Sequence, residues 1–410
     1  MSSNIEGAQR AYEDLVGKGL KLDLTRGRPS QKQLDLSNDL LALPGTEYTA
    51  ASGADCRNYG GTQGLPELRQ IFAPLANVPI AQLVAAGNSS LELMHDALVN
   101  AMLNGVPGSE RRWVDEPEVA FLCPVPGYDR HFTLCERFGI RMISVPMHSS
   151  GPDMDIVEDL VANDASIKGI WCVPRYSNPD GAVYSDETVQ RLAEMPTAAP
   201  DFRIVWDDAY VVHTLTDSVA ELGDVLALSA TAGHPDRPWV FMSTSKVTYA
   251  GAGVAFFAGS TTNIEWWLKI LATRTIGPDK VNHLRHARFL KDQDGLMALM
   301  AQHREILRPK FDLVERLFAE GLSDLDSVSW STPTGGYFVT LTVPADRASK
   351  VVALAADAGI ALTPAGATHP HGREPEDRTI RIAPSYPELD DLELAISGVV
   401  DCVRLAALAQ

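Results

Sequence analysis

Short apolar runs in the middle of the chain alternate with segments whose apolar residues recur at helical spacing. The runs that predict strands are 119–123, 140–145, 169–173, 203–206, 239–242 and 253–258. The segments that predict helices between them are 91–103, 129–138, 156–162 and 186–193. Most of the runs are continuously apolar, which is typical of strands covered on both faces. This alternation predicts an α/β fold, with a mostly parallel sheet sandwiched by helices.

The last third of the chain has a different pattern. A long helical pattern runs from about residue 281 to residue 320, and we expect Pro309 to interrupt it. Strand-like residues 336–342 and 379–382 then alternate with helix-like residues 348–358 and 389–405. This mixture predicts a second, smaller α+β domain.

Three parts of the chain are therefore expected. Residues 51–300 form a large domain, residues 301–410 form the small C-terminal domain, and the N-terminal segment 1–50 joins the small domain. A chain of 410 residues, 45% of them hydrophobic, is long enough for two packed domains.

Composition excludes several classes of partner. The net charge of −18 repels nucleic acid and anionic membranes, and no apolar stretch approaches the roughly 20 residues that span a bilayer. The polar N-terminus carries no signal-peptide pattern. The five cysteines are scattered and odd in number, which favours reduced thiols in a cytoplasmic protein, and no metal-ligand spacing occurs.

Lys246 is the residue most informative for chemistry. It follows the apolar run 239–242 in the sequence Ser-Thr-Ser-Lys. Partial desolvation at the end of a buried strand lowers the pKa of a lysine amine, and a neutral amine attacks carbonyl groups. The hydroxyl groups before it suit an anion such as a phosphate. Taken alone, the same tetrapeptide also describes a surface lysine in a loop.

Other polar residues also follow predicted strands. Asp207 comes directly after the run 203–206, where its carboxylate can face a protonated ring nitrogen. Asn178 lies in an Asn-Pro-Asp-Gly sequence that turn chemistry alone also explains. Asn88 and Ser89 precede a predicted helix, either as caps or as part of an anion site at its N-terminus.

Aromatic, glycine and arginine positions complete the set. Tyr128 lies in a Pro/Gly loop, where its ring can lie against a flat cofactor, and the Tyr59 phenol can bond a phosphate or simply pack. Gly27 lies in a turn that can bring the backbone close to a ligand. Arg381 can grip a carboxylate through its bidentate fork, or lie solvated on the surface.

Most of these residues lie at a predicted strand end, where open α/β sheets bind ligands. An amine beside a phosphate cradle, with a carboxylate for a ring nitrogen, matches the needs of pyridoxal 5′-phosphate (PLP). The protonated PLP ring is an electron sink. We therefore predict PLP as the cofactor.

With these residues in this order, the chain resembles the class I/II aminotransferases, PLP enzymes of fold type I. It is similar in particular to a divergent bacterial branch that is aspartate-aminotransferase-like. The likeness extends from Gly27 to Arg381. It implies a large PLP-binding domain with a seven-stranded, mostly parallel sheet, and a homodimer with shared active sites.

The resemblance also implies a role for each candidate residue. Lys246 is the Schiff-base lysine and the catalytic general base and acid. The implied cofactor contacts are Asp207 with the pyridine nitrogen, Asn178 and Tyr210 with the phenolic oxygen, Tyr128 as the stacking ring, Asn88, Ser89, Ser243 and Ser245 around the phosphate, and Tyr59 from the other subunit. The implied substrate contacts are Arg381 on the α-carboxylate, with Gly27 and Asn178 beside it.

One departure from the family concerns the phosphate. The family commonly has an arginine eight positions after the lysine, and this chain has Val254 there. We therefore expect hydroxyls, amides and a helix dipole to hold the phosphate, or a cation from elsewhere.

The resemblance implies reversible transamination, with aspartate and 2-oxoglutarate as the preferred amino-acid and 2-oxo-acid substrates. The alternatives are alanine–glyoxylate or kynurenine transamination, a PLP β-lyase or decarboxylase, and a PLP-binding regulator without turnover. A second substrate carboxylate needs a second cation. Sequence alone does not rank the five candidates for it, which are Arg28, Arg57, Arg130, Arg175 and Arg274.

Overall fold

The computed structural model describes residues 2–408, and its largest element is an eight-stranded sheet. Its strands, in spatial order, are β2 Leu83–Ala85, β9 Ala255–Ala258, β8 Pro238–Ser243, β7 Arg203–Asp207, β6 Ile167–Cys172, β3 Ala120–Val125, β4 Arg141–His148 and β5 Gly151–Pro152. The five strands from β8 to β4 pair in parallel, whereas β9 and β5 run antiparallel to their neighbours. The predicted α/β class is confirmed. The eighth strand is the two-residue β5, which extends one edge beyond the seven strands expected.

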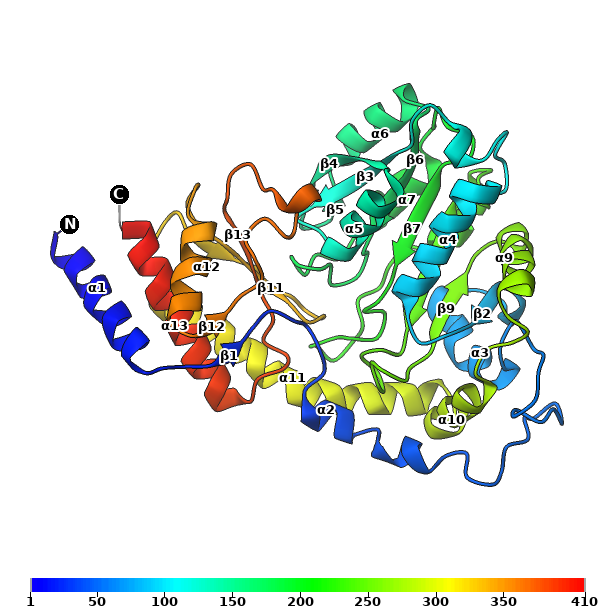
Figure 1. Cartoon of the computed structure of the whole chain (residues 1–410), viewed down its shortest axis with the longest axis horizontal. Coiled ribbons are helices and arrows are strands. Elements are labelled where there is room, and N and C mark those ends of the chain that lie inside the picture. The colour runs from blue at the N-terminus through cyan, green and yellow to red at the C-terminus, as the bar shows by residue number, and fades with distance from the viewer. Residues whose placement is uncertain (1, 409–410) are drawn as a thin grey trace.

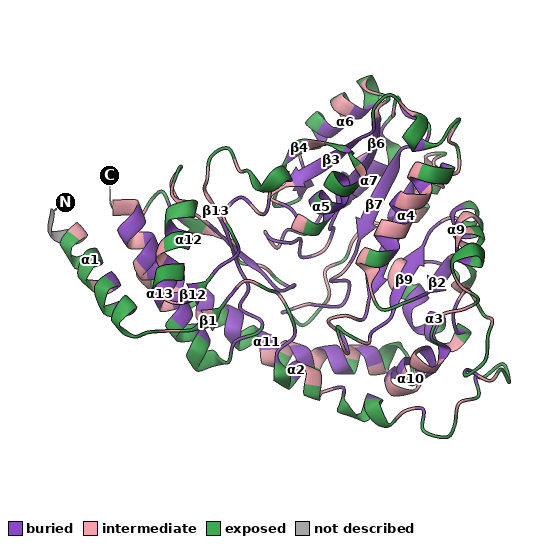
Figure 2. Cartoon of the chain, in the orientation of Figure 1, coloured by how far each residue is buried: buried purple, intermediate pink, exposed green. Residues whose placement is uncertain are grey.

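Alternate residues of each central strand pack into opposite cores. In β7, Ile204 and Trp206 belong to the core on one face of the sheet, and Val205 belongs to the core on the other. The first face is covered by α3 Pro66–Phe72, α6 Met154–Asn163, α7 Asp186–Glu194 and α8 Val225–Thr231, and the second by α4 Ser90–Asn104, α5 Asp129–Phe138 and α9 Thr261–Arg274. Figure 2 shows buried strands between helices whose outer faces are exposed. Burial on both faces explains the continuously apolar runs.

A smaller unit lies at the end of the molecule that carries both termini (Figure 1). Its antiparallel sheet contains β10 Ser329–Trp330, β11 Val339–Thr342 and β13 Thr379–Ile382, and a parallel pair joins β1 Leu22–Asp23 to β12 Ile360–Ala361. Its helices are α1 Ser2–Gly17, α12 Ala348–Asp357 and α13 Leu389–Leu408, while the short α2 Gln31–Asp35 leads toward the large sheet. One hydrophobic core contains residues of both chain ends, Leu15 and Val399 among them. The N-terminal segment therefore begins in the smaller unit.

Helix α11 Gln293–Leu322 connects the two units. Leu296 and Met300 belong to a core of the large sheet, whereas Leu307 and Phe311 belong to the core of the smaller unit. The predicted interruption at Pro309 is wrong, because α11 continues through this residue. Residues on both sides of Pro309 are buried in one core, so packing holds the helix where a backbone hydrogen bond is missing.

The break in this long helical pattern lies earlier. Helix α10 Lys280–Leu290 ends at Lys291, whose φ of 66° is left-handed. The predicted domain boundary at residue 300 falls inside α11 and stays a prediction, as does the boundary at residue 50. Within residues 2–408, no helix has both the length and the apolar character needed to cross a membrane. All five cysteines are free and buried.

Candidate active site

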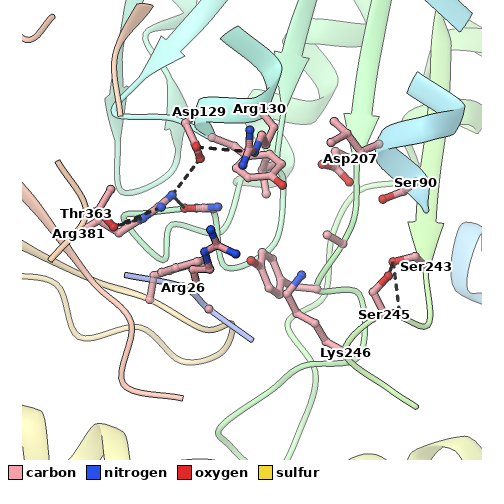
Figure 3. Close-up of a pocket in the computed structure, with 18 of the residues that line it drawn as sticks. Arg26, Ser90, Asp129, Arg130, Asp207, Ser243, Ser245, Lys246, Thr363 and Arg381 are labelled. Atoms are coloured by element: carbon pink, nitrogen blue, oxygen red, sulfur yellow. Dashed lines mark hydrogen bonds and ion pairs between the residues drawn. The ribbon is translucent and has the colours of Figure 1, made fainter. Parts of the chain in front are cut away.

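A cavity of about 690 Å³ lies at the carboxyl ends of the central strands, and residues of the smaller unit line its other side. The last residues of β7 and β8, Asp207 and Ser243, both line it. Figure 3 shows side chains from both units directed into it. Ten of the twelve residues predicted from the sequence line this cavity: Gly27, Ser89, Tyr128, Asn178, Asp207, Tyr210, Ser243, Ser245, Lys246 and Arg381.

The Lys246 amine lies against aromatic rings. Its Nζ is 4.9 Å from the ring centroid of Tyr210 and 5.8 Å from that of Tyr337. Burial lowers the pKa of Lys246, and the negative charge of Asp207 opposes this shift with a smaller effect. A larger fraction of the amine is therefore neutral and nucleophilic than in an exposed lysine.

Asp207 is held by a histidine that the sequence prediction missed. The Oδ2 atom of Asp207 lies 3.0 Å from Nε2 of His131, and the imidazole stacks on the indole of Trp171 at a centroid distance of 4.2 Å. The second oxygen, Oδ1, is buried and has no hydrogen-bond partner among the described residues. A buried carboxylate oxygen without a partner is costly, so this atom suits a cationic N–H donor from a ligand.

His131 lies on α5 three residues after Tyr128, so helical spacing could have placed both side chains on the same side of the helix, toward the site. A single histidine on an apolar helix face is by itself a weak signal. The ring lies under a buried strand end only because α5 packs on that face of the sheet.

A group of hydroxyls forms the second end of the cavity. Ser89 is the N-cap of α4, where its side chain accepts a hydrogen bond from the Glu92 amide. The hydroxyl of Ser243 lies 3.1 Å from that of Ser245. Amides and positive dipole at the start of a 15-residue helix favour an anion beside these hydroxyls.

Position 254, where the family commonly has an arginine, adds no cation to this cluster of serine hydroxyls. Val254 is fully buried, and its backbone N–H donates to Oγ1 of Thr244. The cations that line the cavity are Arg26, Arg130, Lys246 and Arg381. Within the described chain, the hydroxyl end of the cavity is therefore built from neutral donors and a helix N-terminus.

Two predicted cofactor residues lie outside the cavity lining. The side-chain amide of Asn88 donates to the carbonyl of Gly251, and the backbone carbonyl of Asn88 accepts from the Ser245 hydroxyl. Tyr59 is 82% exposed on a loop that Lys280 holds through the carbonyls of residues 58 and 60. The predicted contacts of Asn88 and Tyr59 with a cofactor stay predictions.

Arg381 lies at the opposite end of the cavity from the hydroxyls. It is 8% exposed, its Nη1 donates to Oδ1 of Asp129 and to Oδ1 of Asn178, and Thr363 accepts from its other edge. The guanidinium lies 4.9 Å from the centroid of the Phe338 ring. Thr363 and Asp129 were not predicted from the sequence, because each meets Arg381 only through tertiary folding.

Glycine at position 27 has a steric cause. A Cβ there would clash with the ring of Phe338, the same ring that contacts the Arg381 guanidinium. Tyr128 and Tyr210 line the cavity, and burial is the main cause that raises the pKa of each phenol. Both phenols are therefore neutral donors near pH 7.

The structure separates the five arginines proposed for a second carboxylate. Arg57, Arg175 and Arg274 form ion pairs with Asp55, Asp208 and Asp96, respectively, and Arg28 stacks on Tyr386. Arg130 lines the cavity, and its nearest carboxylate partner is the neighbouring Asp129 at 4.0 Å. Arg26, which the sequence prediction did not include, also lines the cavity.

Comparison with known proteins gives a consistent assignment. The family model for aspartate amino-transferase matches residues 1–410. An aspartate aminotransferase of Corynebacterium glutamicum is 49% identical over 403 residues, 98% of this chain and 93% of the relative. A Mycolicibacterium smegmatis protein, provisionally assigned as an aminotransferase, is 56% identical over 97% of this chain and 94% of its own length.

Solved structures agree with this assignment. A crystal structure of an aspartate transaminase from Corynebacterium glutamicum superposes with a TM-score of 0.96 at 48% identity, covering 98% of this chain and 95% of that one. An alpha-aminoadipate aminotransferase from Thermus thermophilus, solved with N-(5'-phosphopyridoxyl)-L-leucine, shares the fold with a TM-score of 0.75 at 18% identity. The superposition covers 96% of this chain and 94% of the Thermus thermophilus chain. This chain belongs to the aspartate amino-transferase family.

Proposed function

We propose that this chain is a PLP-dependent aminotransferase that transfers the amino group of aspartate to 2-oxoglutarate. The observation that carries the proposal is the arrangement of one cavity, in which the Lys246 amine lies between a hydroxyl-lined helix N-terminus and the Arg381 guanidinium. An amine, an anion site and a carboxylate site are the three contacts that PLP and an amino acid require together.

The residues of this cavity fit PLP. The partnerless Oδ1 of Asp207 suits the protonated pyridine nitrogen, and the neutral donors Asn178 and Tyr210 suit the phenolic oxygen. Ser89, Ser243 and Ser245 suit the phosphate, and the ring of Tyr128 provides a flat surface for stacking. When bound, PLP supplies an aldehyde for the amino group and an electron-withdrawing ring that acidifies the substrate Cα–H bond.

The chain's own residues perform the remaining tasks. Arg381 orients the substrate through its α-carboxylate, which places the Cα–H bond near Lys246. The neutral amine of Lys246 would accept the proton from the substrate Cα as a base, and its conjugate acid would then deliver a proton to the carbon on the other side of the substrate nitrogen. Phe338 and Tyr210 exclude water around this transfer, which strengthens the electrostatic contacts inside the cavity.

Two guanidinium groups support a dicarboxylate substrate. Arg26 and Arg130 line the same cavity as Arg381, and within the described residues neither guanidinium group forms a hydrogen bond or an ion pair closer than 4.0 Å. A second substrate carboxylate supplies the partner that they lack. Aspartate and 2-oxoglutarate both carry one, and the relative of 49% identity is named aspartate aminotransferase.

The proposed assembly is a homodimer in which Tyr59 enters the partner's cavity. An aromatic side chain that is 82% exposed, on a loop anchored by Lys280, supports a contact outside the chain itself. The proposed compartment is the cytoplasm, in keeping with five free cysteines.

A panel of amino donors tests the proposal. Purified protein loaded with PLP is incubated with 2-oxoglutarate and aspartate, alanine or kynurenine, and each 2-oxo-acid product is quantified. We expect oxaloacetate from aspartate at the highest kcat/KM. Absence of oxaloacetate would exclude the aspartate pair, and release of ammonia or CO₂ without a 2-oxo acid from the amino donor would indicate a lyase or a decarboxylase instead.

A further inference from the structure

The residue proposed to bind the substrate α-carboxylate already binds a carboxylate of the chain itself. Nη1 of Arg381 lies 3.2 Å from Oδ1 of Asp129, the first residue of α5. The Arg381 side chain is 8% exposed and that of Asp129 is 31% exposed. The contact is therefore largely withdrawn from solvent, where an ion pair is screened less than on the surface.

This contact uses the guanidinium edge that a substrate needs. Thr363 Oγ1 accepts from both Nε and Nη2 of Arg381, and Nη1 donates to Asp129 and Asn178. A bidentate carboxylate contact requires two parallel N–H groups directed at the ligand. A substrate carboxylate therefore competes directly with Asp129 for Arg381.

Asp129 has a second cation within reach. Its Oδ2 atom lies 4.0 Å from Nε of Arg130, so the two oxygens of one carboxylate face two different guanidinium groups. Figure 3 shows the Asp129 carboxylate between Arg381 and Arg130. Arg130 is 55% exposed and forms no closer ion pair with any described residue, so it can approach Asp129 when Arg381 releases that carboxylate.

We propose that Asp129 is an internal carboxylate that occupies Arg381 in the absence of substrate and thereby weakens the binding of every carboxylate substrate. Substrate binding moves the Asp129 carboxylate from Arg381 toward Arg130. The inference depends on the substrate-binding role of Arg381 under the proposed function. It adds Asp129 as a residue that determines KM without taking part in proton transfer.

An alternative role for Asp129 predicts the opposite sign. If Asp129 served to orient Arg381 for its ligand, neutralising Asp129 would loosen the guanidinium and weaken substrate binding. If Asp129 competes with the ligand, neutralising it strengthens binding. The direction of the change in KM therefore separates the two roles.

The test uses the PLP-loaded full chain with the substitution Asp129→Asn. KM and kcat are measured for aspartate, together with the inhibition constant of maleate, a dicarboxylate that has no amino group to react. A hydrogen bond to a charged group contributes enough to change an equilibrium by about tenfold or more. We expect KM and the maleate inhibition constant each to fall about tenfold, with kcat within about twofold of the wild type.

Two further variants make the test specific. Asp217→Asn removes the same charge from a side chain that is 95% exposed and lies outside the cavity lining, and we expect no change in either constant. Asp129→Ser keeps a polar residue at the start of α5 and is expected to reproduce Asp129→Asn. If Asp129→Asn folds poorly, Asp129→Ser still measures the effect of removing the carboxylate on KM and on the maleate inhibition constant.

The outcomes distinguish this inference from the proposed function. A KM and a maleate inhibition constant that stay unchanged or rise in both Asp129 variants would overturn the inference while transamination by the wild type stands. A wild-type chain that binds PLP but produces no 2-oxo acid from any amino donor would overturn the proposed function itself, and the inference with it.

Discussion

The hydrogen bond between His131 and Asp207 gives the sharpest prediction about the cofactor site. The imidazole of His131 stacks on Trp171 at an interplanar angle of 8°, and the substitution His131→Phe puts a slightly larger aromatic ring without nitrogens in this position. Both partners of the bond are nearly fully buried, with side-chain exposures of 1% for His131 and 4% for Asp207. The variant therefore isolates one buried hydrogen bond.

The size of the effect follows from the surroundings of Asp207. Because Oδ1 already has no partner among the described residues, losing the bond to Oδ2 leaves the whole carboxylate without a hydrogen bond. A hydrogen bond to a charged group contributes about 1.5–3 kcal/mol. We expect the free energy of unfolding of the PLP-free protein to fall by about that amount. We also expect kcat of the loaded enzyme to fall about tenfold or more, because the carboxylate is no longer held at one orientation.

Urea denaturation and steady-state kinetics measure the two quantities. A matched control is His148→Phe, which removes a histidine–aspartate pair whose histidine is 58% exposed. Exposed pairs contribute about 1 kcal/mol or less, so this control is expected to change stability slightly and kcat not at all. Wild-type stability and wild-type kcat in His131→Phe would refute the reasoning.

Three further predictions concern the phosphate end, the substrate end and the pH dependence. Ser89→Ala removes the N-cap of α4, so we expect the free energy of unfolding to fall by about 1 kcal/mol. We also expect the PLP dissociation constant to rise about tenfold in a fluorescence titration. An unchanged PLP affinity would contradict the proposal that neutral donors at the hydroxyl end of the cavity hold the phosphate. Arg26→Met is expected to raise KM for aspartate about tenfold and to leave KM for alanine within about twofold, whereas equal changes would show that Arg26 does not read a second carboxylate. Burial lowers the pKa of His213 to about 3 from an ordinary 6.5, so between these values the unfolded chain binds more protons and stability falls as the pH falls. Denaturation at several pH values should show a shallower fall in His213→Phe, and an identical slope would rule out this contribution.

The fold was predictable where burial leaves a strong local signal. The central strands are covered on both faces and read as apolar runs, and α5 and β13 occupy the same residues as predicted. The three-residue β2 gave no signal, because such a short strand is defined by its pairing with β9. The continuity of α11 through Pro309 depends on burial of residues on both sides of it in one core, which no local pattern contains.

The site was predictable where a residue follows a strand. Asp207 and Ser243 end β7 and β8, so the parallel sheet brings them to one edge. His131, Asp129 and Arg26 were missed because their positions depend on how α5 and the N-terminal segment pack. Ranking the arginines required their carboxylate partners, and these come from other parts of the chain for Arg175 and Arg274.

Borohydride reduction followed by peptide mass spectrometry tests the central claim most directly. Reduction fixes any covalent bond between a lysine and the PLP aldehyde, and the modified residue is identified in a proteolytic digest of the loaded protein. We expect one modification per chain, at Lys246, and none in Lys246→Ala. A loaded protein whose Lys246 peptide stays unmodified, or whose modification lies on another lysine, would contradict the account.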